Sequence, residues 1–291
     1  MAEAYFDYGR MINELDGFLN KYSFLSVIEV GKSILGNSIP AVIFGEGKSI
    51  VAYVGGEVGC DPFSPFILMR FVRDACALYE GGGSAFGFSA ENIFKNYTLV
   101  IIPLLNPDGL NYFANGIELE NPLFERAMKL NGGGDFSHWR GNARGVDLKY
   151  NYGLEYSESQ PEAEVGRLCN FLRYGFTPDM LIDFSYSQGE NEKEVIHFCG
   201  GEEENKMAVA LSQMSGIARE YSESVIENRT LYEWARGELY ASAFSVELER
   251  MNFLSKKHFE DTGFLCYLNL RKLLYCAPFL TKLRQNRIEK G

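Results

Sequence analysis

The sequence predicts a single α/β domain with a mixed, largely parallel sheet and helices on both faces. Apolar segments of strand length alternate along the 291-residue chain with segments of helical periodicity. The segment Tyr97–Leu105 has no charged residue, which is typical of a strand in a sheet covered on both faces. The 46% hydrophobic content suffices for a large core. No repeat or linker is visible, so residues 1–291 are expected to form one domain.

The elements are expected in the following order. Periodicity and turn residues predict strands at 24–30, 39–44, 49–54, 97–105, 180–186, 194–199 and 244–248. Helices are predicted at 5–21, over about 15 residues ending near Gly81, at 161–174, at 203–222 and at about 260–285. Residues 31–36 and 106–109 have turn chemistry, and 81–90 and 114–160 are expected to be loops.

Composition excludes several functions. The chain carries 28 Lys and Arg against 39 Asp and Glu, a net charge of −11, and has no basic cluster for nucleic acid. Gly81–Gly83 lacks the spacing of a phosphate-binding loop. No signal sequence or apolar membrane span is visible, so we expect a cytoplasmic protein without a membrane partner. The cysteines form no C-x-x-C pair and are expected to be free, mostly buried thiols: Cys60, Cys76, Cys169, Cys199, Cys266 and Cys276.

Four motifs occur in one order along the chain. They are Asn106-Pro107-Asp108-Gly109, the segment 130–148 (LNGGGDFSHWRGNARGVDL), Ser187-Gln188-Gly189-Glu190, and Trp234 followed thirteen residues later by Glu247. Together they resemble the zinc metallocarboxypeptidase family, the carboxypeptidase A-like fold. The resemblance is greatest to the bacterial branch that cleaves γ-D-glutamyl-diaminopimelate bonds in peptidoglycan peptides. It implies the fold deduced above and a site on the loops after the strands.

The zinc ligands that this resemblance implies have been replaced. The family holds zinc with two histidines and a glutamate. Here Val58 and Asp61 stand at the first two ligand positions, and Tyr186 stands at the third, directly before Ser187. Valine has no donor atom, and a phenol with a pKa of about 10 is a poor zinc ligand at neutral pH. We therefore expect no zinc and no other cofactor.

The remaining histidines offer no replacement. None of His138, His197 and His258 has a second histidine or a cysteine three or four residues away. We interpret them as a loop hydrogen-bonder, a core residue and a surface residue, respectively.

Other positions match the family in part. Glu247 matches the general base, and Arg140 matches the arginine that polarises the scissile carbonyl. The asparagine–arginine pair that anchors the substrate is replaced by Lys149-Tyr150. Arg144 could supply a carboxylate-binding fork or could brace its loop through a salt bridge.

Several functions therefore stay open. The first is a degenerate family member that binds a peptide or muropeptide-like ligand, or a protein partner, without cleaving it. The second is a hydrolase that uses Mg²⁺, Ca²⁺ or Mn²⁺, with Asp61, Glu57, Glu247 or nearby carboxylates as oxygen ligands. The third is a conventional zinc peptidase, and an unrelated activity in the old cleft is the fourth. The alignment predicts that Val58, Asp61, Arg140, Tyr186 and Glu247 converge in one cleft. The sequence leaves the oligomeric state open.

Overall fold

The computed structural model describes residues 6–153, 160–190, 193–222, 230–250 and 255–288. Their main sheet has eight strands in the order β1-β2-β6-β3-β7-β10-β8-β9. The strands are β1 (Ser26–Lys32), β2 (Ser38–Phe44), β3 (Ser49–Val54), β6 (Tyr97–Ile102), β7 (Met180–Glu190), β8 (Val195–Phe198), β9 (Ala218–Tyr221) and β10 (Ser242–Arg250). The central strands β6, β3, β7 and β10 are parallel to one another, as predicted. The pairings β1–β2, β2–β6 and β10–β8 are antiparallel, and β8–β9 is parallel.

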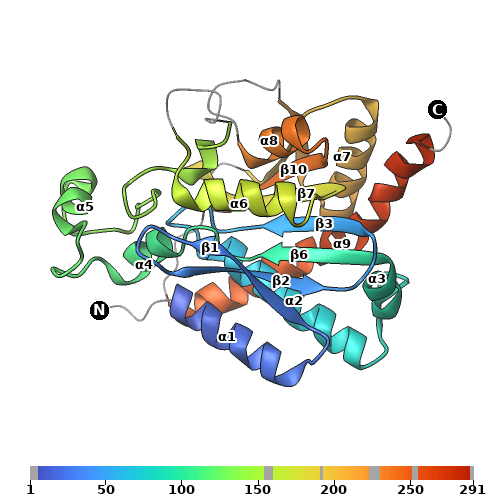
Figure 1. The fold of residues 1–291 in the computed structure, drawn as a ribbon, viewed down its shortest axis with the longest axis horizontal. Helices are drawn as coiled ribbons and strands as arrows, with labels where there is room; N and C mark the ends of the chain where they lie inside the picture. The colour runs from blue at the N-terminus through green and yellow to red at the C-terminus, as the bar shows by residue number, and fades with distance from the viewer. Residues whose placement is uncertain (1–5, 154–159, 191–192, 223–229, 251–254, 289–291) are drawn as a thin grey trace.

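Helices cover both faces of this sheet (Figure 1). Side chains of α1 (Tyr8–Lys21), α2 (Phe63–Glu80), α7 (Glu202–Ser215) and α9 (Lys256–Ile288) pack into one core with one set of alternating strand residues. The other core contains α6 (Ala163–Tyr174), α8 (Leu231–Glu238) and the opposite strand residues. The predicted three-layer α/β architecture is confirmed. None of the described helices combines the length and apolar character needed to cross a membrane.

One predicted helix and one predicted turn differ from the structure. The helix predicted at 203–222 ends at Ser215, because Gly216 adopts the left-handed conformation (φ 77°) that commonly terminates helices. The chain then adds β9 at the sheet edge. The turn predicted at 106–109 is instead the start of α4 (Pro107–Asn115). The Asn106 side chain accepts a hydrogen bond from the Gly109 amide, and Pro107 fits the first helical turn.

Three short helices were missed because each is too short to show periodicity. They are α3 (Ala90–Asn96), α5 (Phe124–Asn131) and α8. Of these, α5 lies inside the predicted loop 114–160, as does the 3₁₀ turn Leu148–Tyr150, and residues 154–159 of that loop lie outside the described part. The strands β4 (Ser84–Ala85) and β5 (Phe88–Ser89) make a small hairpin within the predicted loop 81–90. The predicted helix start at residue 5 also lies outside the description, and α1 begins at Tyr8.

A small third core holds the long segment after α4 against the sheet end. Tyr112 packs with Phe136 and Trp139, and α5 contributes Ala127. The neighbouring Asp108 carboxylate accepts hydrogen bonds from the Ser33 hydroxyl at 2.7 Å and the Leu35 amide at 2.9 Å, which ties α4 to the β1–β2 turn. These contacts fix the position of Arg140, immediately after Trp139.

Candidate functional site

The loop after β3 is held by backbone contacts on both sides. The Gly55 amide donates to the Ile102 carbonyl at 2.9 Å, and the Gly59 amide donates to the Arg140 carbonyl at 2.8 Å. The Asn106 side-chain amide donates to the Glu57 carbonyl at 3.0 Å. The loop that carries the predicted ligand positions therefore lies directly against the segment of Arg140.

Val58 and Asp61 are both fully buried in this loop. One oxygen of the Asp61 carboxylate accepts hydrogen bonds from the backbone amides of Phe63 and Ser64, at 2.9 and 3.0 Å. The other oxygen accepts the Ser64 hydroxyl. Burial raises the pKa of Asp61 to about 6, although these hydrogen bonds oppose the rise. Asp61 precedes Pro62, the N-cap residue of α2, and one of its oxygens therefore caps two backbone amides of the first helical turn while the other holds the Ser64 hydroxyl.

Tyr186 lies on the α2 side of β7. It belongs to the core shared with α2 and α9, and its ring centroid is 5.8 Å from that of Phe63. In the register of the parallel strands, Tyr186 pairs with Leu248, whereas Glu247 pairs with Ser185. Because side chains alternate along a strand, Tyr186 and Glu247 leave the sheet on opposite faces.

Glu247 lies in a buried ion pair. The Lys149 ammonium is 2.9 Å from Glu247 Oε2, and only 5% of the lysine side chain and 12% of the glutamate side chain are exposed. His197 Nε2 lies 3.2 Å from the same oxygen. Burial would raise the pKa of Glu247, but the hydrogen bond from His197 and the charge of Lys149 lower it to about 2. The interpretation of His197 as an ordinary core residue is corrected, because the antiparallel β10–β8 pairing brings it to the carboxylate.

Sequence reasoning missed Asp183 and Tyr152 beside this ion pair. Asp183 lies in β7, buried between neighbouring strands, and its Oδ2 accepts the Ser245 hydroxyl at 2.7 Å. The Tyr152 hydroxyl donates to Glu57. Burial raises the pKa of Asp183 to about 7. The pKa of Glu57 is raised well above its usual range, mainly by burial and secondly by the negative charge of Asp183. An aspartate inside an otherwise apolar strand was the signal that could have revealed this cluster.

Arg140 connects the loop to β7. Its Nε donates to Asp147 Oδ2 at 2.9 Å, and its Nη1 donates to the Ser187 carbonyl at 3.4 Å. Its Nη2 is buried and has no hydrogen-bond partner among the described residues. Arg140 thus lies between the ligand-position loop and the residue that follows Tyr186.

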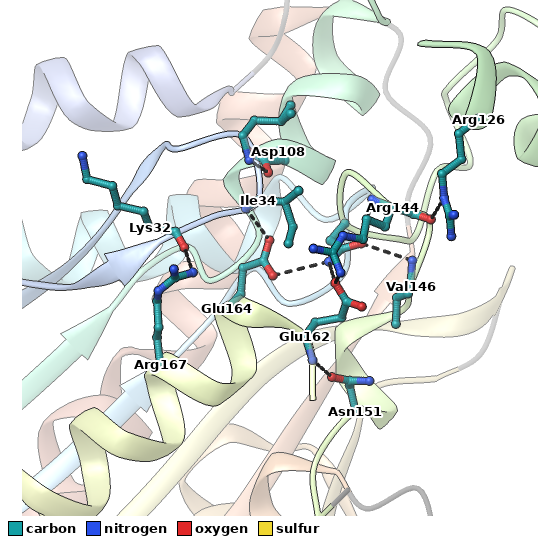
Figure 2. Close-up of polar contacts among 12 residues, drawn as sticks. Lys32, Ile34, Asp108, Arg126, Arg144, Val146, Asn151, Glu162, Glu164 and Arg167 are labelled. Carbon is teal, nitrogen blue, oxygen red and sulfur yellow. Dashed lines mark hydrogen bonds and ion pairs between the residues drawn. The ribbon is translucent and has the colours of Figure 1, made fainter. Parts of the chain in front are cut away.

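Arg144 and Tyr150 show no direct contact with the carboxylate of Glu247 among the described residues. Figure 2 shows Arg144 beside Glu162, with an Nη1–Oε2 distance of 3.6 Å, and half of the arginine side chain is exposed. The same Glu162 oxygen accepts the Asn142 side-chain amide at 2.9 Å. This is the loop-bracing arrangement, the second of the two roles considered for Arg144. The Tyr150 ring centroid lies 5.9 Å from the Lys149 ammonium.

The structure therefore brings most of the predicted residues to one end of the sheet, but the prediction of a single cleft is corrected. Tyr186 and Glu247 leave opposite faces of the sheet, and Val58, Asp61 and Tyr186 are buried. Glu247 contacts Lys149, and the charge of Lys149 also acts on Glu57 and Asp183. Asp61 and Tyr186 are engaged on the α2 side. His138 and His258 are exposed, in agreement with their predicted loop and surface positions. Across the described ranges, no group of three or more His, Cys, Asp or Glu side chains is arranged to hold a metal ion. None of the six cysteines forms a disulfide, and Cys266 is only partly buried.

Comparisons with solved structures agree with the fold. A metallo-carboxypeptidase from Burkholderia cenocepacia superimposes with a TM-score of 0.65 and 15% identity, over 94% of this chain and 71% of that one. Carboxypeptidase A from Helicoverpa armigera gives a TM-score of 0.62 and 15% identity, over 94% and 73%. At such identities these likenesses establish the fold alone.

Sequence comparisons identify the family. The γ-D-glutamyl-L-diamino acid endopeptidase 1 of Lysinibacillus sphaericus is 28% identical over 144 residues, 49% of this chain and 36% of that protein. The Bacillus subtilis (strain 168) protein YqgT is 27% identical over 150 residues, 50% of this chain and 40% of that protein. The chain thus matches well under half the length of these curated relatives. The sequence profile described as zinc carboxypeptidase matches residues 11–170, more than half of the chain. The chain therefore belongs to the zinc carboxypeptidase family.

Proposed function

We propose that this chain is a catalytically degenerate zinc carboxypeptidase that binds a peptide or muropeptide-like ligand, or a protein partner, without cleaving it. The observation that carries the proposal is the use of Asp61 as a helix cap. Asp61 is the one predicted ligand position that still bears a carboxylate, and both of its oxygens already accept hydrogen bonds from α2. Val58 supplies no donor, and Tyr186 packs against Phe63. A zinc site needs at least three good protein donors, so these residues do not fit the ion.

The general-base position supports the same proposal. A carboxylate with a pKa of about 2, held by Lys149 and His197, has little tendency to take a proton from water at neutral pH. Water that is not bound to a metal is also a poor source of the hydroxide nucleophile, because its pKa is about 15.7. Retained Glu247 and Arg140 therefore do not suffice for hydrolysis.

The ligand class follows from the relatives. The Lysinibacillus relative is a γ-D-glutamyl-L-diamino acid endopeptidase by name, and we propose a peptide of that chemistry as the first ligand to test. We further propose a cytoplasmic setting, which the absence of disulfides among the described cysteines supports. We also propose that no nucleic acid binds, which the acidic composition supports.

One observation favours a second candidate, an active metallopeptidase that uses a metal other than zinc. Glu57 Oε2 is a buried carboxylate oxygen without a hydrogen-bond partner among the described residues. However, burial raises the pKa of Glu57 well above its usual range, which favours the protonated form, and a protonated carboxyl group is a poor metal ligand. We therefore rank this activity second.

The test combines metal analysis with a cleavage assay. We expect the purified protein to contain no stoichiometric zinc and to leave γ-D-glutamyl-diaminopimelate peptides intact, with or without added Zn²⁺ or Mn²⁺. Calorimetric titration with the same peptides reports binding separately from cleavage. The triple variant Val58→His, Asp61→Glu, Tyr186→His restores the ligand types and is expected to bind zinc where the parent does not.

Glu247→Gln is the matched control for activity. Stoichiometric metal in the parent, together with turnover that both a chelator and Glu247→Gln abolish, would establish an active peptidase and contradict the proposal. Peptide turnover that Glu247→Gln leaves unchanged would instead indicate a contaminating enzyme.

A further inference from the structure

The feature that calls for explanation is a buried lysine among several buried carboxyl groups. Lys149 is 4% exposed, and Glu57, Asp183 and Glu247 are each 9% exposed or less. Taking a lone ammonium or carboxylate out of water costs several kcal/mol unless an opposite charge compensates it. The groups must therefore be explained together.

The carboxyl groups come from three neighbouring parts of the sheet. Glu57 follows the end of β3, Asp183 lies in β7 and Glu247 lies in β10, and these strands are adjacent and parallel. Strand pairing joins Val54 to Asp183 and Ser245 to Asp183. The carboxyl groups are thus brought to the same end of the fold by backbone pairing.

Lys149 contacts one of these carboxyl groups and acts on the other two through its charge. It contacts Glu247 directly at 2.9 Å, and its charge also lowers the pKa of Glu57 and of Asp183, against the larger effect of burial. Glu57 Oε2 and Asp183 Oδ1 are buried without a hydrogen-bond partner among the described residues. Hydrogen bonds therefore do not fully offset the cost of burying these two carboxyl groups. His197 adds a second contact to Glu247.

We propose that Lys149 is a tethered counter-cation, whose ammonium neutralises the buried carboxyl cluster of Glu57, Asp183 and Glu247 in place of a bound metal ion. This role is independent of whether the chain binds or cleaves a peptide. In this role Lys149 pairs with carboxyl groups inside the fold. It does not anchor a ligand carboxylate, which is the role that its position in the family resemblance implies.

The test is the pH dependence of the stability lost in Lys149→Met, which keeps the length of the side chain and removes its charge. At pH 8 we expect Tm to fall by about 10 °C relative to the parent, because one partner of a buried pair is left uncompensated. At pH 5 the loss should be less than half as large, because protons can neutralise the carboxyl groups that Lys149 no longer faces. The groups that titrate around it are Glu57, Asp147, Tyr150, Asp183, His197 and Glu247.

Lys206→Met is the matched control, because Lys206 forms an exposed pair with Glu202 at 2.7 Å. We expect it to change Tm by less than about 2 °C at both pH values. A loss in Lys149→Met that is equal at pH 5 and pH 8 would show that Lys149 contributes packing alone and would overturn the proposal.

A second variant keeps the test decisive if Lys149→Met does not fold. Lys149→Met with Glu247→Gln removes both charges of the direct pair, and it should recover at least a third of the Tm lost in the single variant, or should fold where the single variant does not. A double variant that is no more stable than Lys149→Met, or that also fails to fold, would contradict a counter-cation role.

Discussion

At the scale of single residues, Asp61 joins the loop after β3 to the first turn of α2. Its carboxylate accepts two backbone amides and the Ser64 hydroxyl in a fully buried position. We expect Asp61→Ala to lower the free energy of unfolding by about 2–3 kcal/mol, because the variant loses a helix cap and leaves buried donors unpaired. Urea denaturation at pH 7 measures this loss.

Asp61→Asn is the matched variant for that measurement. Its amide oxygen can still accept the backbone amides, so we expect it to lose less than half as much stability as Asp61→Ala. Equal stability of Asp61→Ala and the parent would show that the carboxylate does not hold α2.

The identities of the altered residues were readable from the sequence, but their partners were not. The motifs gave the positions of Val58, Asp61 and Tyr186 because they are local in sequence. The partner of Glu247 is Lys149, 98 residues earlier, and only the folded sheet end brings the two together. His197 was assigned to the core for the same reason, since its contact with Glu247 depends on the register of β8 against β10.

At the scale of elements, the contact between the β3 loop and the Arg140 segment depends on Gly59. A Cβ at this position would lie 2.7 Å from the Trp139 carbonyl oxygen and 2.8 Å from that of Gly141. Both are backbone atoms in a packed segment and cannot move aside cheaply. We expect Gly59→Ala to lower the free energy of unfolding by about 2–3 kcal/mol, as for overpacked sites, measured by urea denaturation.

Gly17→Ala provides the control for that substitution. Gly17 lies within α1, and a Cβ there would meet nothing within 4 Å. Alanine should therefore stabilise the protein by about 0.5–1 kcal/mol. Two variants with the same small change in stability would mean that the β3 loop is not closely packed against residues 139–141.

The elements also show why the fold class was easier to predict than its details. Long apolar strands such as β6 and long helices such as α2 carry enough residues to display their periodicity. The short helix α8 instead depends on a capping box between Thr230 and Glu233. The end of α7 was missed because the helical pattern continues past Gly216, whereas the left-handed conformation of this glycine ends the helix.

At the scale of the whole molecule, buried acids give folding an unusual dependence on pH. The pKa of Asp61 is raised to about 6 and that of Asp183 to about 7, both mainly by burial, and that of Glu57 is raised as well. A raised pKa in the folded state means that the folded protein binds protons more tightly than the unfolded chain. The corresponding stability is present below pH 4 and is lost as the pH rises toward 7.

Glu247 acts in the opposite direction. Its pKa is lowered to about 2, because His197 and Lys149 outweigh burial, so its stabilising contribution is complete above about pH 4.5 and is lost as the pH falls toward 2. The two effects place maximum stability at about pH 4–5. We expect urea denaturation to give a free energy of unfolding that declines from pH 5 to pH 8.

Asp183→Asn separates this effect from general charge repulsion, which the net charge of −11 also increases with pH. The variant removes one buried carboxyl, so between pH 5 and pH 8 its stability should decline by about 2–3 kcal/mol less than that of the parent. The exposed substitution Asp16→Asn changes the net charge equally and should leave the decline almost as steep as in the parent. If both variants flatten the curve to the same extent, net charge and not the buried cluster governs how stability depends on pH. If only Asp183→Asn flattens it, the excess of buried carboxyl groups over the single ammonium of Lys149 sets the pH at which this fold is most stable.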